Sequence, residues 1–214
     1  MAGYGNTWSN GKSVYMQLKQ DADGHDLDPA DPDNWTVPTP IYRNDASLLN
    51  GNKQLAATAS GGVGMSLDMT YFQDADGRSY YAWQQLGATY IATMDPKDPA
   101  HVTSSPVRIV TPEYAWNAAI AEGPNVTLRD GKLYLMFSGS GVGKTYTTGL
   151  AVADASGTDL TDPASWTVLN YPIQKSGPFN GEMQLGTGHG MWSEDEDGNQ
   201  IYVFHAYATK NLAP

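Results

Sequence analysis

AAIAEGPNVTLRDGKLYLMFSG, residues 118–139, is the stretch from which the fold is predicted. Its second half is a strand-like run of aromatic and aliphatic residues, opened by the turn signal Arg-Asp-Gly. Its first half places one carboxylate, Glu122, among small apolar residues. Because carboxylates are seldom buried without a partner, this position indicates a specific role for Glu122.

The same arrangement recurs along the chain, and helical periodicity is nearly absent. Turns ending in glycine precede aromatic strands at Gly11, Gly77, Gly131 and Gly198. Two units continue into similar loops, DPDNWTVPTPIY and DPASWTVLNYPI. Antiparallel units repeated in this way are typical of a β-propeller, whereas a two-sheet sandwich would show similar strands without a repeated unit. We therefore predict a single all-β propeller domain over residues 1–214.

Composition narrows the function classes. The formal net charge is −11, with the acidic residues spread along the chain, which argues against nucleic acid or an anionic membrane surface as partner. The chain has no cysteine, so disulfide and thiolate chemistry are excluded. No apolar run approaches the roughly 20 residues of a membrane span. The first residues show no signal-peptide pattern, and the localisation, cytoplasmic or secreted, stays open.

Three chemically reactive residues occupy corresponding positions in the repeat. Counting nine residues back from the last three turn glycines reaches Asp68, Glu122 and His189. In a propeller the first strand of each blade lines the central channel, so equivalent positions on different blades would converge on the axis. Two carboxylates and an imidazole are suited to a polar site there. The alternative is coincidence among 4 histidines and 23 acidic residues, each solvated at a strand end.

At these residues the sequence resembles glycoside hydrolase family 43, five-bladed propellers that remove arabinose or xylose from plant polysaccharides. The resemblance runs from about Gly64 to Tyr207. The segments SLDMTYFQDADGRSYYAWQQ, YAWNAAIAEGP and GTGHGMW look like the family's auxiliary-aspartate, general-acid and central-histidine segments. TPEYAW before the acid segment and DPASW after it complete an ordered set. The set is most similar to the exo-acting α-1,5-L-arabinofuranosidase branch.

The resemblance implies a role for each of the three residues. Glu122 would be the general acid, and Asp68 the carboxylate that tunes its pKa. His189 would be the axial residue, which in many members binds calcium or another cation directly or through water. The family inverts the anomeric configuration: an acid protonates the leaving oxygen while a carboxylate base activates water. A like charge on Asp68 and partial burial would both raise the pKa of Glu122. No other cofactor is expected.

The family's general base, an aspartate on the first blade, has no match in this sequence. Asp21, Asp23 and Asp26 follow the first aromatic strand in what the pattern indicates is a peripheral loop, and none of them is assigned. The chain is therefore expected to hold an incomplete propeller, about three full blades plus partial ones, lacking parts at the N-terminus and the C-terminus. Activity of this chain alone stays open, and open blade edges would favour self-association.

The predicted reaction is inverting release of terminal L-arabinofuranose from α-1,5-linked arabino-oligosaccharides or arabinan. A β-D-xylosidase of the same family is one alternative, and a non-catalytic carbohydrate-binding propeller is another. In each case the partner is a pentose-containing oligosaccharide or polysaccharide. A third alternative is a structural fragment that self-associates.

Aromatic residues add further predictions. Tyr114 and Trp116 precede the acid segment in a loop, where they form either a sugar-stacking, substrate-binding platform or ordinary packing. Trp35 and Trp166 occupy equivalent loops and are interpreted as repeated structural packing. Trp83 is expected in the core.

Two remaining signals are interpreted structurally. DADGHDLD and DADGRS are similar to calcium loops but lack the full ligand set at fixed spacing, so they are predicted to be hairpin turns. His205 is interpreted as a core histidine in preference to an axial one.

Overall fold

The computed structural model describes residues 3–4, 12–49 and 66–208. Within these residues the protein consists of strands joined by turns and by short 3-10 helices, which confirms the all-β prediction. The 3-10 helices are η2 (Pro32–Asn34), η4 (Ala115–Asn117) and η5 (Pro163–Ser165). No helix in this part of the chain has the length and apolar character needed to cross a membrane.

The described strands form four antiparallel sheets in chain order. The first sheet contains β1 (Gly3–Tyr4), β2 (Lys12–Tyr15) and β3 (Thr39–Pro40). The second contains β4 (Leu67–Gln73), β5 (Ser79–Gln85), β6 (Ala88–Asp95), β7 (Asp98–Val102) and β8 (Val107–Val110). The third contains β9 (Ala121–Arg129), β10 (Lys132–Gly139), β11 (Thr147–Asp154) and β12 (Thr167–Val168). The fourth contains β13 (Gly177–Phe179), β14 (Glu182–Glu194) and β15 (Gln200–Ala208).

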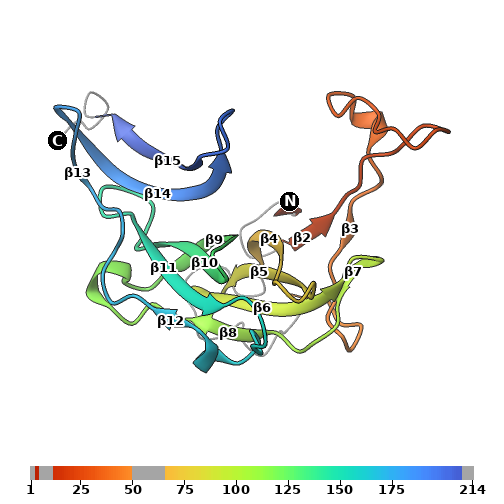
Figure 1. Ribbon diagram of the computed structural model, residues 1–214, viewed down its shortest axis with the longest axis horizontal. Helices are drawn as coiled ribbons and strands as arrows, with labels where there is room; N and C mark the ends of the chain where they lie inside the picture. The colour runs from red at the N-terminus through yellow and green to blue at the C-terminus, as the bar shows by residue number, and fades with distance from the viewer. Residues whose placement is uncertain (1–2, 5–11, 50–65, 209–214) are drawn as a thin grey trace.

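The sheets follow one another around an arc, as Figure 1 shows. Strand β9 contacts β4 of the preceding sheet and β14 of the following sheet, so these three strands lie together on the inner side of the arc. Separate antiparallel sheets arranged about a common centre are the blades of a β-propeller. The predicted architecture is therefore confirmed, and equivalent residues of β4, β9 and β14 are placed near one another.

Apolar side chains fill the spaces between the first three sheets. One cluster, between the second and third sheets, includes Tyr80, Leu133 and Leu135. A second cluster, between the first and second sheets, includes Ile41 and Trp83. Trp83 is fully buried, which confirms its predicted place in the core. These two cores include residues of β4 and β9, two of the three inner strands that carry the candidate site.

The two DPxxW loops have the same local structure. Asp31 and Asp162 each cap a short 3-10 helix by accepting a hydrogen bond from the backbone N–H two residues later. The indole N–H of Trp35 and that of Trp166 each donate to a backbone carbonyl six residues earlier. Both tryptophans thus close their own loop, which confirms the prediction of repeated structural packing.

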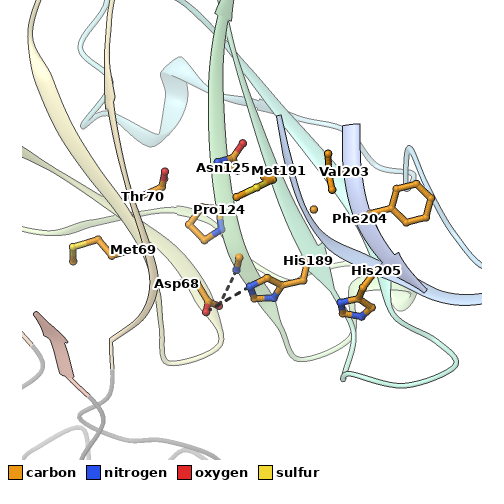
Figure 2. A pocket seen from close by; sticks show the side chains of 12 residues that line it. Asp68, Met69, Thr70, Pro124, Asn125, His189, Met191, Val203, Phe204 and His205 are labelled. Carbon is orange, nitrogen blue, oxygen red and sulfur yellow. Dashed lines mark hydrogen bonds and ion pairs between the residues drawn. The ribbon is translucent and has the colours of Figure 1, made fainter. Parts of the chain in front are cut away.

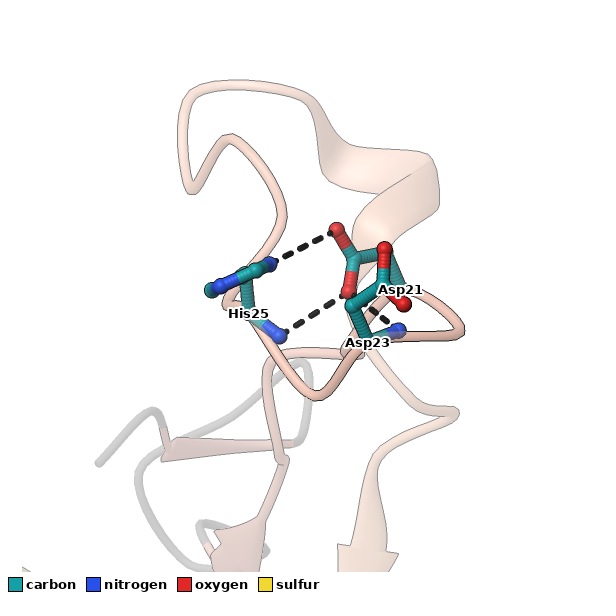
Figure 3. A group of neighbouring side chains, drawn as sticks. All are labelled: Asp21, Asp23 and His25. Carbon is teal, nitrogen blue, oxygen red and sulfur yellow. Dashed lines mark hydrogen bonds and ion pairs between the residues drawn. The ribbon is translucent and has the colours of Figure 1, made fainter.

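The three D-x-D-G segments also share one turn. In each, the first aspartate, Asp21, Asp74 or Asp195, accepts hydrogen bonds from the backbone N–H groups two and four residues later. The side chain four residues later reaches back to the same carboxylate. Figure 3 shows this turn in the first segment, where Asp23 and His25 lie beside Asp21. Because the bonding recurs in all three segments, the cluster in Figure 3 is explained by the turn, as predicted.

The Asp74 turn also joins the second sheet to the loop that follows β11. Arg78 Nη2 donates to the carbonyl of Thr158 at 2.6 Å, and Asp76 accepts from the Ser156 hydroxyl at 2.6 Å. The backbone N–H of Ala75 donates to a carbonyl of the same loop. The turn therefore connects neighbouring blades as well as two strands of one blade.

Candidate active site

Each of the three inner strands has left-handed backbone at a residue near the centre of the arc, and β14 has it at Gly186 (φ 64°) as well. The residues near the centre are Asp68 in β4 (φ 55°), Gly123 in β9 (φ 59°) and His189 in β14 (φ 47°). The pairing of each strand with its neighbour shifts register at the same place. A bulge of this kind re-aims side chains out of the normal alternation. It explains why Asp68 and His189 approach each other although they lie on different sheets.

The structure corrects the nine-residue correspondence in one respect. Gly123, and not Glu122, has the backbone conformation of Asp68 and His189. The nine-residue count fails at Glu122 because the turns differ in length. Strands β9 and β10 are joined by Asp130 and Gly131 alone, whereas the other two turns are longer. The equal offset therefore marks equivalent positions at Asp68 and His189 but not at Glu122, which directly precedes the equivalent residue Gly123.

Asp68 links all three strands. Its Oδ2 accepts a hydrogen bond from the backbone N–H of Gly123 at 3.1 Å, and its Oδ1 lies 3.7 Å from His189 Nε2, as Figure 2 shows. The backbone N–H of His189 donates to Ser138 Oγ at 2.7 Å. A Cβ at Gly123 would lie 3.3 Å from the His189 ring, so glycine provides both the backbone conformation and the space.

Glu122 is held by a tyrosine that the sequence did not indicate. The Tyr146 hydroxyl donates to Glu122 Oε1 at 2.5 Å and lies 3.2 Å from His189 Nδ1. Burial raises the pKa of Glu122; the Tyr146 hydrogen bond opposes that shift, the negative charge of Asp68 adds to it, and His189 opposes it. The net direction is upward, which keeps a carboxyl group protonated to higher pH.

A cavity of about 630 Å³ opens beside these residues between the second, third and fourth sheets. It is lined by Asp68, Met69, Thr70, Gly123, Pro124, Asn125, His189, Gly190, Met191, Val203, Phe204 and His205. Glu122 is not part of this lining, and it joins the group through Tyr146. The predicted trio is thus brought together: Asp68 and His189 line the cavity, and Glu122 is connected to His189 through the Tyr146 hydroxyl.

His205 does not have the predicted core position. It is exposed, lines the cavity, and its ring stacks on Tyr146 with the ring centres 5.6 Å apart. Partial burial lowers the pKa of His205, and the neighbouring His189 lowers it further. The interpretation as a core histidine is therefore wrong, because residues 201, 203, 205 and 207 of β15 all point away from the blade interior.

Trp116 and Tyr114 stack on each other with ring centres 6.1 Å apart. Trp116 also stacks on the buried Phe137, and its indole N–H donates to the carbonyl of Asn170. Both side chains are half-buried, and neither lines the cavity. Packing accounts for these contacts, and the substrate-platform role stays a prediction.

The residues around His189 fit a directly coordinated cation poorly. The Nδ1 atom of His189 already faces the Tyr146 hydroxyl, and Nε2 faces Asp68. Among the described residues, Asp68 is the one carboxylate that pairs with the His189 ring. Calcium takes about six to eight oxygen ligands. The Asp21 cluster is the one place in the described chain where three metal-ligating side chains converge. A cation held near His189 through water stays a prediction.

Comparison with known proteins agrees with this architecture. A family model, Glycosyl hydrolases family 43, matches residues 52–213. The extracellular exo-α-(1→5)-L-arabinofuranosidase of Streptomyces chartreusis is 33% identical over 159 residues, which cover 69% of this chain and 46% of that protein. The α-L-arabinofuranosidase 43 of Humicola insolens is 32% identical over 152 residues, covering 65% of this chain and 30% of that protein. The chain thus spans between about a third and a half of these curated relatives.

Solved structures share the fold. An α-L-arabinofuranosidase from Lactobacillus brevis superposes with a TM-score of 0.68 at 24% identity, covering 97% of this chain and 66% of that one. A xylan β-1,4-xylosidase from Bacillus halodurans C-125 gives a TM-score of 0.56 at 15% identity, covering 81% and 29%. The match of the family model to most of the residues, together with the relatives and the shared fold, shows that the chain belongs to family 43 of the glycosyl hydrolases.

Proposed function

We propose that the chain provides the general acid of an inverting glycoside hydrolase. Glu122 is that acid, and Asp68 is the carboxylate that raises its pKa. The observation that carries the proposal is the position of Glu122. It is half-buried, its pKa is raised by burial and by the charge of Asp68, and its neighbour in the chain, Gly123, lines the cavity. A carboxyl group that stays protonated near neutral pH is what a general acid requires.

The upward shift of the Glu122 pKa favours the protonated form from which the proposed chemistry begins. Glu122 would protonate the glycosidic oxygen as the bond to the sugar breaks, while a water activated by a base attacks from the other face. Asp68 would remain the acceptor of the Gly123 N–H bond and the neighbour of His189 throughout. The base is not assigned to a residue of this chain.

The proposed substrate is an α-1,5-linked arabino-oligosaccharide or arabinan, from which terminal L-arabinofuranose is released. Support comes from the names of the similar proteins, which include two exo-α-(1→5)-L-arabinofuranosidases and two further α-L-arabinofuranosidases. A β-D-xylosidase is the nearest rival, since xylose is also a pentose and the pocket loops would decide between the sugars.

A substrate panel tests the proposal. Nitrophenyl α-L-arabinofuranoside, nitrophenyl β-D-xyloside and arabino-oligosaccharides would be supplied to this chain and to a version extended at its N-terminus. Release of arabinose, with the inverted anomer seen first by NMR, is the expected result. Faster release of xylose would favour the rival, and saturable sugar binding without turnover in either version would indicate a carbohydrate-binding module.

The acid role has its own test in Glu122→Gln. Loss of the proton donor should reduce turnover of arabino-oligosaccharides by about 10²- to 10⁴-fold. It should affect a dinitrophenyl arabinoside much less, because that leaving group needs no protonation. Glu113→Gln is a matched control, since Glu113 is exposed and precedes the site in the chain. Full oligosaccharide turnover by Glu122→Gln would remove Glu122 from the acid role.

A further inference from the structure

Tyr146 occupies the junction between the candidate acid and the rest of the site. It directly precedes β11 and is fully buried. Among the described residues, the Tyr146 hydroxyl is the only side-chain group that contacts both the Glu122 carboxyl group and the His189 ring. Burial raises the pKa of Tyr146, and the adjacent Glu122 raises it further, so the hydroxyl keeps its hydrogen throughout the working pH range.

The ring of Tyr146 is held from two sides. One face stacks on His205, with an angle of 17° between the ring planes. The ring also packs against the backbone of Gly188, where an added Cβ would lie 2.5 Å from Tyr146 Cδ1. A residue confined in this way places its hydroxyl at a fixed point, which is what a side chain that orients another group requires.

The number of donors and acceptors at the Tyr146 hydroxyl gives the two oxygens of Glu122 different roles. A tyrosine hydroxyl has one hydrogen to donate and can also accept. Its hydrogen goes to Glu122 Oε1, which leaves the hydroxyl oxygen as the acceptor for a hydrogen on His189 Nδ1, while the other ring nitrogen faces Asp68. With Oε1 occupied, Oε2 is the oxygen left to carry the acidic proton. Oε1 can accept this bond before and after that proton departs.

We propose that Tyr146 is a positioning residue for the acid: it fixes Oε1 of Glu122, leaves Oε2 to give its proton to the glycosidic oxygen, and connects the carboxyl group through His189 to Asp68. The inference rests on the proposed function, because it assumes that Glu122 is the proton donor. It assigns to His189 a hydrogen-bonding role in this chain of side chains, which agrees with the engagement of both its ring nitrogens.

A leaving-group comparison tests the role. Tyr146→Phe, which keeps the ring and removes the hydroxyl, should lower kcat for arabino-oligosaccharides by about 10- to 100-fold, the size of one lost hydrogen bond to a charged group. For a dinitrophenyl arabinoside the loss should be under about threefold, and KM should change little for both. A purely structural defect would lower both activities alike, and that result would overturn the proposal.

Tyr202→Phe is the matched control. The Tyr202 hydroxyl is also hydrogen-bonded inside the fold, to Thr148 Oγ1 at 2.5 Å, but it has no bond to the acid. This variant should show no dependence on the leaving group. If Tyr146→Phe and Tyr202→Phe behave alike while Glu122→Gln loses oligosaccharide turnover, the positioning role is wrong and the acid role stands. If Glu122→Gln keeps full turnover, the proposed function itself fails.

A second measurement does not depend on turnover. Crystal structures of the wild-type chain and of Tyr146→Phe would show the orientation of Glu122 directly. We expect the carboxyl group to leave its wild-type position or to occupy several positions once the hydroxyl is gone. A single, unchanged Glu122 conformation in the variant would overturn the proposal.

Discussion

Removal of the Asp74 carboxylate should destabilise the protein far more than its place in a surface turn suggests. Asp74 is 4% exposed. Its Oδ1 accepts from the backbone N–H groups of Asp76 and Arg78, and its Oδ2 accepts from Arg78 Nε at 2.7 Å and from the Tyr80 hydroxyl at 3.1 Å. Asp74→Ala would remove all four bonds and loosen the turn that joins two blades.

The magnitude follows from what each partner loses. The Tyr80 ring is 1% exposed, so its hydroxyl would be left buried without an acceptor, at a cost of about 1–3 kcal/mol. The backbone bonds of the turn add about 1 kcal/mol. The Arg78 side chain is 44% exposed and can regain water, so the larger cost of an orphaned buried charge does not apply in full. The total is about 2–4 kcal/mol, or a fall in Tm of about 5–15 °C for a chain of this length.

Thermal unfolding followed by circular dichroism would measure the fall in Tm. The control is Asp195→Ala, which removes the same turn bonds at an exposed turn where the carboxylate side-chain partner is Asn199 alone. The control should lose clearly less. Equal falls in Tm for the two variants would refute the reasoning that burial and the link to the neighbouring blade make the Asp74 turn the stronger one.

Two further predictions concern the site. Asp68→Asn removes a charge that raises the pKa of Glu122, and since the acid must be protonated, the alkaline limb of the pH–rate profile should move to lower pH. Burial, the larger cause, remains, so part of the upward shift should persist; an unmoved limb would contradict the role of Asp68. Gly188→Ala should cost about 1–3 kcal/mol and reduce oligosaccharide turnover, because the new methyl group meets the Tyr146 ring. Gly177→Ala, with its nearest neighbour atom at 3.8 Å, should change neither unfolding temperature nor turnover, and equal effects of the two variants would contradict this account.

The fold could be predicted because its signals are local. Each D-x-D-G turn is bonded within five consecutive residues, and each DPxxW loop closes on a carbonyl six residues away. Such segments carry their own structure wherever they occur, so their repetition revealed the blades. The buried place of Trp83 followed from the same strand pattern.

The site could be predicted only in part, because its contacts join residues far apart in the chain. Asp68, Glu122 and His189 were found through a regular offset, although Glu122 takes a different place from the one that the offset implied. Tyr146 was missed and His205 was assigned to the core, because nothing in their neighbourhood distinguishes them from other aromatic or imidazole side chains in strands. Their importance appears only when the third and fourth blades are packed together.

The left-handed backbone at Asp68 and His189 has an evolutionary consequence. Glycine adopts that conformation at the lowest cost, and Gly123 already meets the same demand in the strand between them. Selection for stability alone would therefore favour glycine at both positions, and only a requirement for the side chains opposes it. A lineage that kept the blades but abandoned sugar chemistry should drift to glycine at positions 68 and 189, so these two sites would record the loss of function before the fold did.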